Sequence, residues 1–385
     1  MITWIITILV LSVPVVVWPE LGVVFNTPKS LLMVVGISLA MVIYIWKPLR
    51  GQLDETTNWL IGILIALNVA SLFYTRNPYY TKQAIILNLA CLGAFYLTAL
   101  YGNVRRVFQA FIVAGVIVSI VTILQFFWEP YFPSRFHFPG KVTGTIGNSN
   151  YIACFLLFPI FACLGLMKSK KRPVVLWSAI AVCLFAILLT RVRSAAFGLV
   201  IGGVVLFFMA RPKIRWRYII PVVALLPLLW IVEPVRTKIK PQDWLRTKSM
   251  SQRVKYWQAA WELIKQAPLA GHGLWSYRKM VYGAQAKIQQ RDPTYFDGYK
   301  KAQPRRVHND YLEVFNDGGL LLFAACGLFL LWTFKQRVRG DPLRAAAFAC
   351  FIAVMASAIF FFPFRINTTM FSSAVMLGIL RGNKA

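Results

Sequence analysis

Acidic residues are scarce in this sequence. Across 385 residues, 13 Asp and Glu stand against 42 Lys and Arg, which gives a formal net charge of +29. Charged residues of either sign make up only 14% of the chain and hydrophobic residues 58%, whereas soluble domains are about one quarter charged. The balance excludes an ordinary soluble domain and predicts an integral membrane protein that meets anionic headgroups or phosphate-bearing substrates. Nucleic acid is the usual alternative for so basic a chain, but the many apolar spans leave no room for a nucleic-acid-binding domain.

The sequence also lacks the residues and motifs that several kinds of functional site require. The six cysteines each lie in an apolar run without ligand spacing, so they predict small buried hydrophobic side chains and neither disulfides nor a metal site. The sequence has no H-E-x-x-H, no G-x-S-x-G and no Walker A motif, so metal, serine-hydrolase and nucleotide chemistry are poorly supported. The apolar runs carry no central Asp, Glu or His, the residues that ion-coupled transporters commonly use. We therefore expect no metal and no cofactor.

Apolar runs long enough to cross a bilayer recur along the chain. The first begins at Ile2 without a basic segment before it, and we expect it to be a span and not a removed signal peptide. The fold class expected is all-α, a polytopic membrane protein of about twelve helices. The predicted spans are 2–18, 31–46, 58–73, 84–101, 106–127, 150–167, 173–190, 195–210, 218–232, 318–334, 344–362 and 367–380.

The short loops predict the orientation of these spans. Lys and Arg are concentrated in alternate loops, which predicts cytoplasmic N- and C-termini and agrees with an even number of spans. Three regions follow: spans at 1–232, a large extracytoplasmic loop at 233–309 and further spans at 310–385. The loop holds sixteen Lys and Arg against five Asp and Glu. A loop longer than about 60 residues is exempt from the positive-inside rule, so its charge calls for a functional explanation.

Within that loop, the sequence predicts an amphipathic helix. Ser249-Met250-Ser251-Gln252 is typical of a helix start, and Val254, Trp257, Trp261 and Ile264 recur at helical spacing before Pro268. We expect this helix to lie on the outer membrane face or on the spans. Arg253 falls in its first turn, where a cation is unfavourable for the helix dipole. A surface arginine and an anion-binding arginine are about equally plausible readings of that residue.

Arginine is the first candidate for chemistry on the outer face. Arg191 and Arg193 lie in a short loop between two apolar spans, with no acid beside them. Arginine keeps its charge and binds phosphate through two parallel hydrogen bonds, so two or three such groups could hold a diphosphate and stabilise it as a leaving group. The alternative is headgroup anchoring by side chains that reach the membrane surface.

Histidine is the second candidate. The chain has three, of which His137 lies in an aromatic loop and His272 between two glycines, where a turn is expected. His308 follows Arg305 and Arg306 and precedes the amphipathic segment that leads into the next span. The two arginines should lower its pKa and leave a neutral imidazole. Such a base could take a proton from a sugar hydroxyl.

A turn before the sixth span is the third candidate. Residues 144–151 read Gly-Thr-Ile-Gly-Asn-Ser-Asn-Tyr, with Ser149 or Asn150 as the expected helix cap. A cap with an interfacial aromatic belt is favoured over catalysis. The free amides at that helix start, near Asn148 and Asn150, could still receive phosphate oxygens.

Taken together, these motifs resemble the O-antigen ligase and O-antigen polymerase family of membrane proteins. The resemblance rests on Gly144-Thr145-x-Gly147-Asn148-x-Asn150, Arg193-Ser194-Ala195, Ser251-x-Arg253-x3-Trp257, Gly271-His272-Gly273 and His308-Asn309-Asp310-Tyr311-Leu312 in that order. It covers about residues 140–335.

The resemblance implies an inverting, metal-independent glycosyltransferase of the bacterial inner membrane with an extracytoplasmic site. It would move a glycan from an undecaprenyl-diphosphate carrier to an acceptor hydroxyl. The family's two key arginines match Arg193 and Arg253, and its histidine matches His308; Arg191 has no clear counterpart. In this hypothesis, Asn309 or Asp310 has an orienting role, and Arg191, Arg305, Arg306, Asn148 and Asn150 join the two key arginines in binding the diphosphate.

Several alternatives remain open at this point. A lipid A–core acceptor would make the protein a ligase, slightly favoured, and a second lipid-linked glycan would make it a polymerase. Transfer to a protein or to a teichoic-type polymer is a third variant. The competing classes are a flippase for the same lipid-linked glycan and a scaffold without activity. Convergence of Arg193, Arg253 and His308 at one outward site would favour the enzyme.

Overall fold

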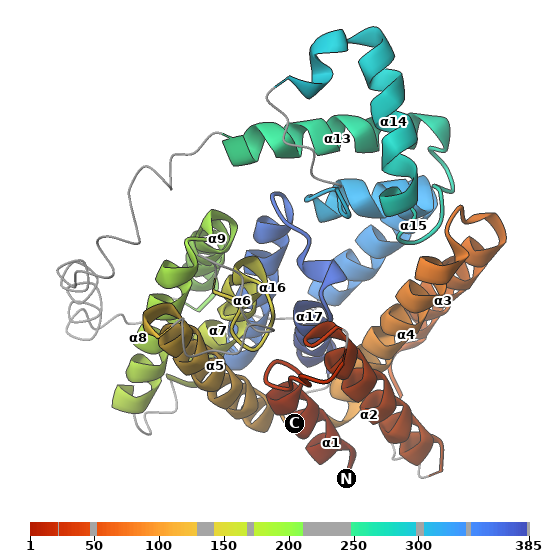
Figure 1. Cartoon of the computed structure of the whole chain (residues 1–385). Helices are drawn as coiled ribbons and strands as arrows, with labels where there is room; N and C mark the ends of the chain where they lie inside the picture. Colours follow the sequence, from red (N-terminus) through yellow and green to blue (C-terminus); the bar gives the residue numbers. More distant parts are fainter. Residues whose placement is uncertain are drawn as a thin grey trace.

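The computed structural model describes residues 1–21, 23–46, 52–128, 142–167, 173–210, 248–297, 304–335 and 340–382 (Figure 1). All regular elements in these ranges are helical, which confirms the all-α class. The helices before the large loop are α1 Ile2–Ser12, α2 Asn26–Trp46, α3 Glu55–Tyr74, α4 Pro78–Tyr101, α5 Val104–Phe127, α6 Ser149–Phe155, α7 Leu157–Leu166, α8 Pro173–Thr190 and α9 Arg193–Ala210. The helices from residue 248 onward are α13 Lys248–Gln266, α14 Tyr277–Arg291, η4 Pro293–Phe296, α15 Asp310–Phe334, α16 Pro342–Ala358, η5 Pro363–Arg365 and α17 Asn367–Arg381.

Seven helical stretches in the described ranges are long and apolar enough to cross a membrane, with α6 and α7 counted as one. They are Asn26–Trp46, Glu55–Tyr74, Pro78–Tyr101, Val104–Phe127, Ser149–Leu166, Pro173–Thr190 and Asp310–Phe334. Shorter apolar helices lie at Ile2–Ser12, Arg193–Met209 and Pro342–Ala358. The chain is therefore a multi-pass membrane protein. The predicted span at 218–232 lies outside the described residues, as does His137, and the number twelve stays a prediction.

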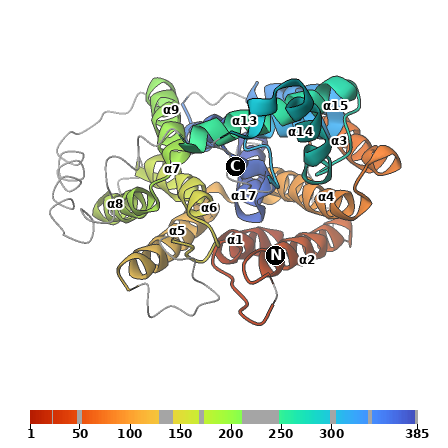
Figure 2. The same ribbon diagram turned by 45° about the horizontal axis from the view of Figure 1, so that its top comes forward.

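Successive long helices run in alternate directions through the bundle (Figures 1 and 2). The helices α13 and α14 cover one end, here called the α13 end, and both chain termini lie toward the opposite end (Figure 1). Arg193 begins α9, and α15 begins after the 304–309 turn, so both starts lie at the α13 end. This arrangement brings together segments that are more than one hundred residues apart in sequence.

The bundle is packed around α17. This helix is buried along its whole length and contacts α4, α16, α2 and α6. Next to it, α16 packs against α9 and α7. The outer helices carry exposed apolar side chains, as α2 does with Leu31, Val35, Leu39 and Val42 at intervals of three and four residues. A face of this kind on a polytopic protein is suited to contact with lipid.

The large loop forms a small core of its own on the bundle. Ala259, Ala260 and Leu263 of α13 pack with Tyr277 and Val281 of α14. The predicted amphipathic helix is thus present, as α13, and its apolar face lies against α14 and the start of α15. The side chain of Trp261 points away from this core and is 55% exposed.

A kink in α15 joins the loop to the spans. At Gly319 the backbone has φ 61° and ψ −161°, which is not helical. The Leu320 and Leu321 N–H groups donate to the carbonyls of Pro268 and Leu269, at 2.8 and 3.1 Å. A helix break that leaves N–H groups buried is stabilised only when other acceptors satisfy them. The segment after α13 supplies those acceptors.

His272 has the turn role expected for it. Its N–H donates to the Asn316 carbonyl at 3.0 Å, and its ring Nε2 lies 2.8 Å from the Leu263 carbonyl. Gly271 and Gly273 on either side have positive φ angles, and a side chain at Gly271 would collide with the backbone of Asp317. His272 therefore docks the end of α13 on α15.

Candidate active site at the α13 end

His308 lies in the turn that precedes α15, with a backbone φ of 59°. Left-handed backbone is uncommon for a residue other than glycine and persists where surrounding contacts impose it. The imidazole stacks on Tyr256 of α13, with 5.5 Å between ring centroids, and meets the Phe362 ring edge-on at 4.8 Å. Its Nδ1 is buried and has no hydrogen-bond partner among the described residues. Aromatic contacts thus hold the ring, and its Nδ1 is available for a hydrogen bond to a further partner.

The charge state of His308 is set by burial and by one arginine. Burial and, after it, the Arg253 guanidinium lower the His308 pKa to about 4, and Glu313 opposes the change. The imidazole is consequently neutral at pH 7. The expected direction was right, but the expected cause, Arg305 and Arg306, was wrong. Arg306 instead donates to Glu313 at 2.9 Å and lies over the Trp275 ring at 4.2 Å.

Arg193 and Arg253 come together although sixty residues separate them in sequence. Arg193 is exposed at the start of α9, and Arg253 is half-buried in the second turn of α13. Burial and the nearby charge of Arg193 both lower the Arg253 pKa. Because Arg253 also acts on His308, the three residues form one electrostatically coupled set. Two cations that repel each other beside a neutral imidazole favour an anionic ligand.

The other predicted arginines lie around this set. Arg191 ends the turn after α8 with a φ of 58°, and its N–H donates to Leu188 at 3.1 Å. Arg305 is exposed, and both Arg305 and Arg306 lie within electrostatic range of the Tyr151 hydroxyl. Tyr151 in turn contacts Phe362, whose ring touches His308. The start of α6 therefore borders the same region.

Asn148 and Asn150 build that helix start. The Asn148 side chain accepts from the Asn150 N–H at 2.9 Å and from its side-chain amide at 3.2 Å. The cap is thus Asn148, and the expectation that Ser149 or Asn150 caps the helix was wrong. Ser149 donates instead to the Val142 carbonyl, at 2.7 Å. Gly147 has a φ of 90° and no room for a side chain against Phe25, so the turn requires glycine. Phosphate binding at these amides stays a prediction.

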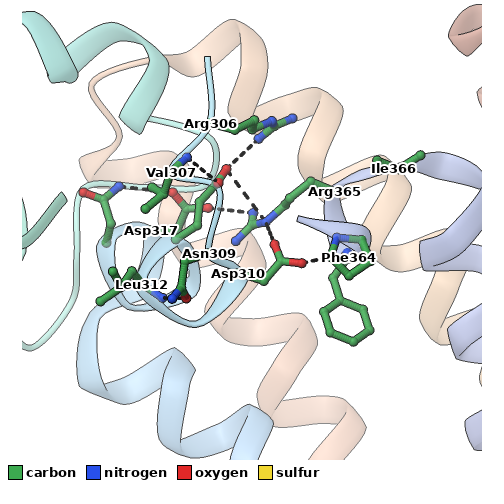
Figure 3. Close-up of polar contacts among 12 residues, drawn as sticks. Arg306, Val307, Asn309, Asp310, Leu312, Asp317, Phe364, Arg365 and Ile366 are labelled. Carbon is green, nitrogen blue, oxygen red and sulfur yellow. Dashed lines mark hydrogen bonds and ion pairs between the residues drawn. The ribbon is translucent and has the colours of Figure 1, made fainter. Parts of the chain in front are cut away.

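A buried ionic network joins the start of α15 to η5, as Figure 3 shows. Asp310, Glu313 and Asp317 follow one face of α15 at intervals of three and four residues. All three approach Arg365 of η5, at 3.4, 4.0 and 2.7 Å respectively. Glu313 also binds Arg306, and Asp310 accepts from the Phe364 N–H at 2.8 Å. Buried carboxylates of this kind need paired cations, and the network supplies them.

Neither predicted orienting residue bonds to the His308 ring among the described contacts. Asn309 caps α15 and accepts from the Leu312 N–H at 3.1 Å. Asp310 is engaged by Arg365 and Phe364. Their orienting role stays a prediction. Sequence reasoning did not single out Glu313, Asp317 or Arg365 for the site, although the helical spacing of three carboxylates before an apolar run was a signal for them.

An aromatic row borders the two arginines. Phe197 lies four residues after Arg193 on α9, and Trp257 lies four residues after Arg253 on α13. Residues four apart share a helix face. The rings of Phe197 and Trp257 both contact Phe360, with centroid distances of 5.9 and 6.4 Å. The cations therefore have an apolar flank, as a headgroup site of a lipid would need.

No group of three or more His, Cys, Asp or Glu in the described ranges could hold a metal ion. The six cysteines are free, and all but Cys326 are buried, as the sequence predicts. That the site uses no metal and no cofactor stays a prediction. The ionisable groups available are two arginines, a neutral imidazole and an acidic network.

Comparison with known families adds a separate finding. Residues 178–325 match the family described as O-antigen ligase. This part of the chain, which is less than half of its length, is similar to that family. A search of curated proteins found no significant match. The matched range begins in α8 and ends in α15, so it contains Arg193, Arg253 and His308. The match indicates a glycosyltransferase-like enzyme of the O-antigen ligase or polymerase type, acting on lipid-linked glycans in the membrane.

Proposed function

We propose that this protein transfers a glycan from an undecaprenyl-diphosphate carrier to an acceptor hydroxyl, at the α13 end of the helix bundle. One observation carries the proposal. Arg193, Arg253 and His308 start from three distant segments and form one coupled set inside the range of the O-antigen ligase match. Two arginines suit a diphosphate, and a neutral imidazole suits a hydroxyl.

In the proposed reaction, the His308 imidazole accepts the proton of the acceptor hydroxyl as that oxygen attacks the anomeric carbon. The bond between this carbon and the diphosphate oxygen breaks, and the electron pair leaves with the diphosphate. Arg193 and Arg253 stabilise the charge that develops there. Attack opposite the leaving group inverts the anomeric centre. No step calls on a metal ion, since the guanidinium charges take the role that a metal has in other diphosphate sites.

The carrier lipid would lie beside the aromatic row of Phe197, Phe360 and Trp257. This row adjoins both arginines; Phe197 lies on α9, Trp257 on α13, and Phe360 in the turn after α16. An apolar contact next to a diphosphate site would hold the first part of a polyprenyl chain through buried apolar area.

We propose that the α13 end faces outward from the bacterial inner membrane, because the loops at the opposite end contain the denser Lys and Arg clusters.

Within this class we favour a ligase with lipid A–core as acceptor over a polymerase that extends a second lipid-linked glycan. A flippase would need cations along the transport path. In the described candidate spans, every Lys and Arg lies within two turns of a helix end. That distribution supports transfer at one surface over passage through the bundle.

The test is an acceptor-dependent release assay in detergent. Wild type and His308→Ala are incubated with an undecaprenyl-diphosphate oligosaccharide and either lipid A–core or a second lipid-linked glycan. Mass spectrometry then measures the free undecaprenyl diphosphate. We expect release by wild type with one acceptor and a loss of about 10³-fold in the variant, the size of a general-base contribution. Equal rates in both proteins would remove His308 as the base, and transport of intact lipid across liposomes without release would support a flippase.

A further inference from the structure

Glu313 makes the contacts that determine where His308 lies. One carboxylate oxygen accepts from the Arg306 guanidinium at 2.9 Å, and the other accepts from the Val307 backbone N–H at 3.0 Å. These are the two residues immediately before His308. The Glu313 N–H also donates to the Asn309 carbonyl at 3.0 Å, just after it. A single buried residue thus contacts the turn on both sides of the histidine.

The backbone of His308 needs such a restraint. Its φ of 59° lies in the left-handed region, where side chains other than glycine are strained. A turn of this kind would relax toward ordinary angles if nothing held its neighbours. The bond from Val307 to Glu313 opposes this relaxation, because the Val307 N–H is buried and has its acceptor there.

The network also fixes the segment that carries Phe362, whose ring packs against the His308 imidazole. Asp310 accepts from the Phe364 N–H at 2.8 Å, and Arg365 binds Asp310, Glu313 and Asp317. These contacts hold η5 against α15 (Figure 3). The ring of Phe362, one residue before η5, lies edge-on to the imidazole at 4.8 Å. The same acidic face of α15 therefore supports the turn that carries His308 and the segment that packs against it.

We propose that Glu313 is a positioning residue for the reaction, holding the Arg306–His308 turn so that the imidazole faces the side of Arg253 and Arg193. The proposal rests on the proposed function, since it assigns Glu313 a part in presenting the proposed base. Glu313 touches neither substrate in this scheme and acts through His308. Its charge has a second effect, because it raises the His308 pKa against burial and Arg253.

Asp317 offers a matched control within the same network. It is fully buried, lies one turn further along α15 and binds Arg365 at 2.7 Å. Its carboxylate also receives the Trp275 N–H, and no bond to residues 305–308 exists among its described contacts. Glu313→Gln and Asp317→Asn thus remove the same charge from the same buried cluster. Glu313→Gln additionally replaces one acceptor of the turn with an amide donor.

The experiment compares turnover, donor binding, melting temperature and pH profile of purified full-length variants. For Glu313→Gln we expect kcat for acceptor-dependent transfer to fall about 30-fold or more, with donor Kd within about threefold of wild type. For Asp317→Asn we expect kcat within about threefold, because Asp310 and Glu313 still pair with Arg365 and Asp310 still accepts from the Phe364 N–H. The acid limb of kcat/KM should move to lower pH in Glu313→Gln and stay in place in Asp317→Asn.

Glu313→Asp serves as a second variant, and it remains informative if Glu313→Gln does not fold. It keeps the charge but shortens the side chain by one methylene, so both contacts cannot be kept together. We expect a lower kcat with an unchanged acid limb. Equal losses of kcat in the Glu313 and Asp317 variants, in proportion to their melting temperatures, would overturn the positioning role. Wild type that releases no undecaprenyl diphosphate would instead refute the proposed function.

Discussion

The two sides of His308 differ in how their charges are compensated. On one side, Arg253 and Arg193 raise each other's electrostatic energy, and burial adds to the cost for Arg253. On the other side, Asp310, Glu313 and Asp317 are paired with Arg365 and Arg306 inside the protein. Like charges thus lie close together on the first side, whereas opposite charges are paired on the second. In the proposed reaction, the basic side binds the anionic diphosphate and the acidic side is a rigid support.

The largest loss of activity should come from a substitution on the basic side of His308, at Arg253. Arg253→Gln removes a charge that would stabilise the departing diphosphate, so we expect kcat/KM to fall about 10²- to 10³-fold, as for loss of one charge-stabilising donor. Arg253→Lys keeps the charge and loses the planar fork, and we expect an intermediate loss. Steady-state release of undecaprenyl diphosphate measures both. Wild-type activity in Arg253→Gln would show that this side does not meet the diphosphate.

The pH dependence of kcat/KM in one variant from each side of His308 would test the comparison of the two sides. A base must be unprotonated, so wild-type kcat/KM should be level from about pH 5 to 8 and fall as pH drops through about 4, where the His308 pKa lies. Arg253 lowers that pKa and Glu313 raises it. Arg253→Gln should therefore move the acid limb to higher pH, and Glu313→Gln should move it to lower pH.

The pH profiles need two checks. The fraction folded is measured by circular dichroism at each pH, so that acid unfolding is not counted as loss of the base. Shifts in the same direction for both variants would contradict the placement of His308 between a basic and an acidic side.

The smallest effect on activity should come from a similar network at the opposite end. Asp54 caps α3, receives the Trp332 indole N–H at 3.1 Å and pairs with Arg381 at the end of α17. Partial burial opposes its ionisation, but hydrogen bonds from Arg381 and Thr57 lower the Asp54 pKa to about 2. Asp54→Asn keeps a capping side chain and loses the ion pair.

For Asp54→Asn we expect a melting temperature lower by a few degrees and a kcat within about twofold of wild type. The folded pKa is below the usual one, so the stabilising effect is complete above about pH 4 and is lost as pH falls toward 2. Thermal melts from pH 7 to pH 3 test this. A large fall in kcat without a fall in melting temperature would show that the two ends are coupled through α15 and α17.

Part of this site could be predicted from the sequence. The amphipathic pattern from residue 249 onward predicted α13, and the glycines around His272 predicted a turn. The short motifs that contain Arg193, Arg253 and His308 lie in the range that matches the family. These features are local, because periodicity, turn chemistry and motif spacing are properties of neighbouring residues. The cap of α6 was misassigned by one or two residues, an error typical of helix ends.

The partners of the charged side chains depended on the tertiary structure. By its position in the sequence, Arg306 should act on His308, yet it turns to Glu313; Arg253, fifty-five residues away, acts on the imidazole instead. Arg365 stands in the sequence as a lone cation between two spans and in the fold pairs with three carboxylates of α15.

Composition and hydropathy were enough to determine a basic, all-helical membrane protein, because transfer of apolar side chains out of water is an additive property of the chain. Coulomb energy depends instead on distance and burial. Only the packing of α9, α13, α15 and η5 decides which charged side chains become neighbours. It therefore also decides which side of His308 carries the arginines proposed to bind the diphosphate.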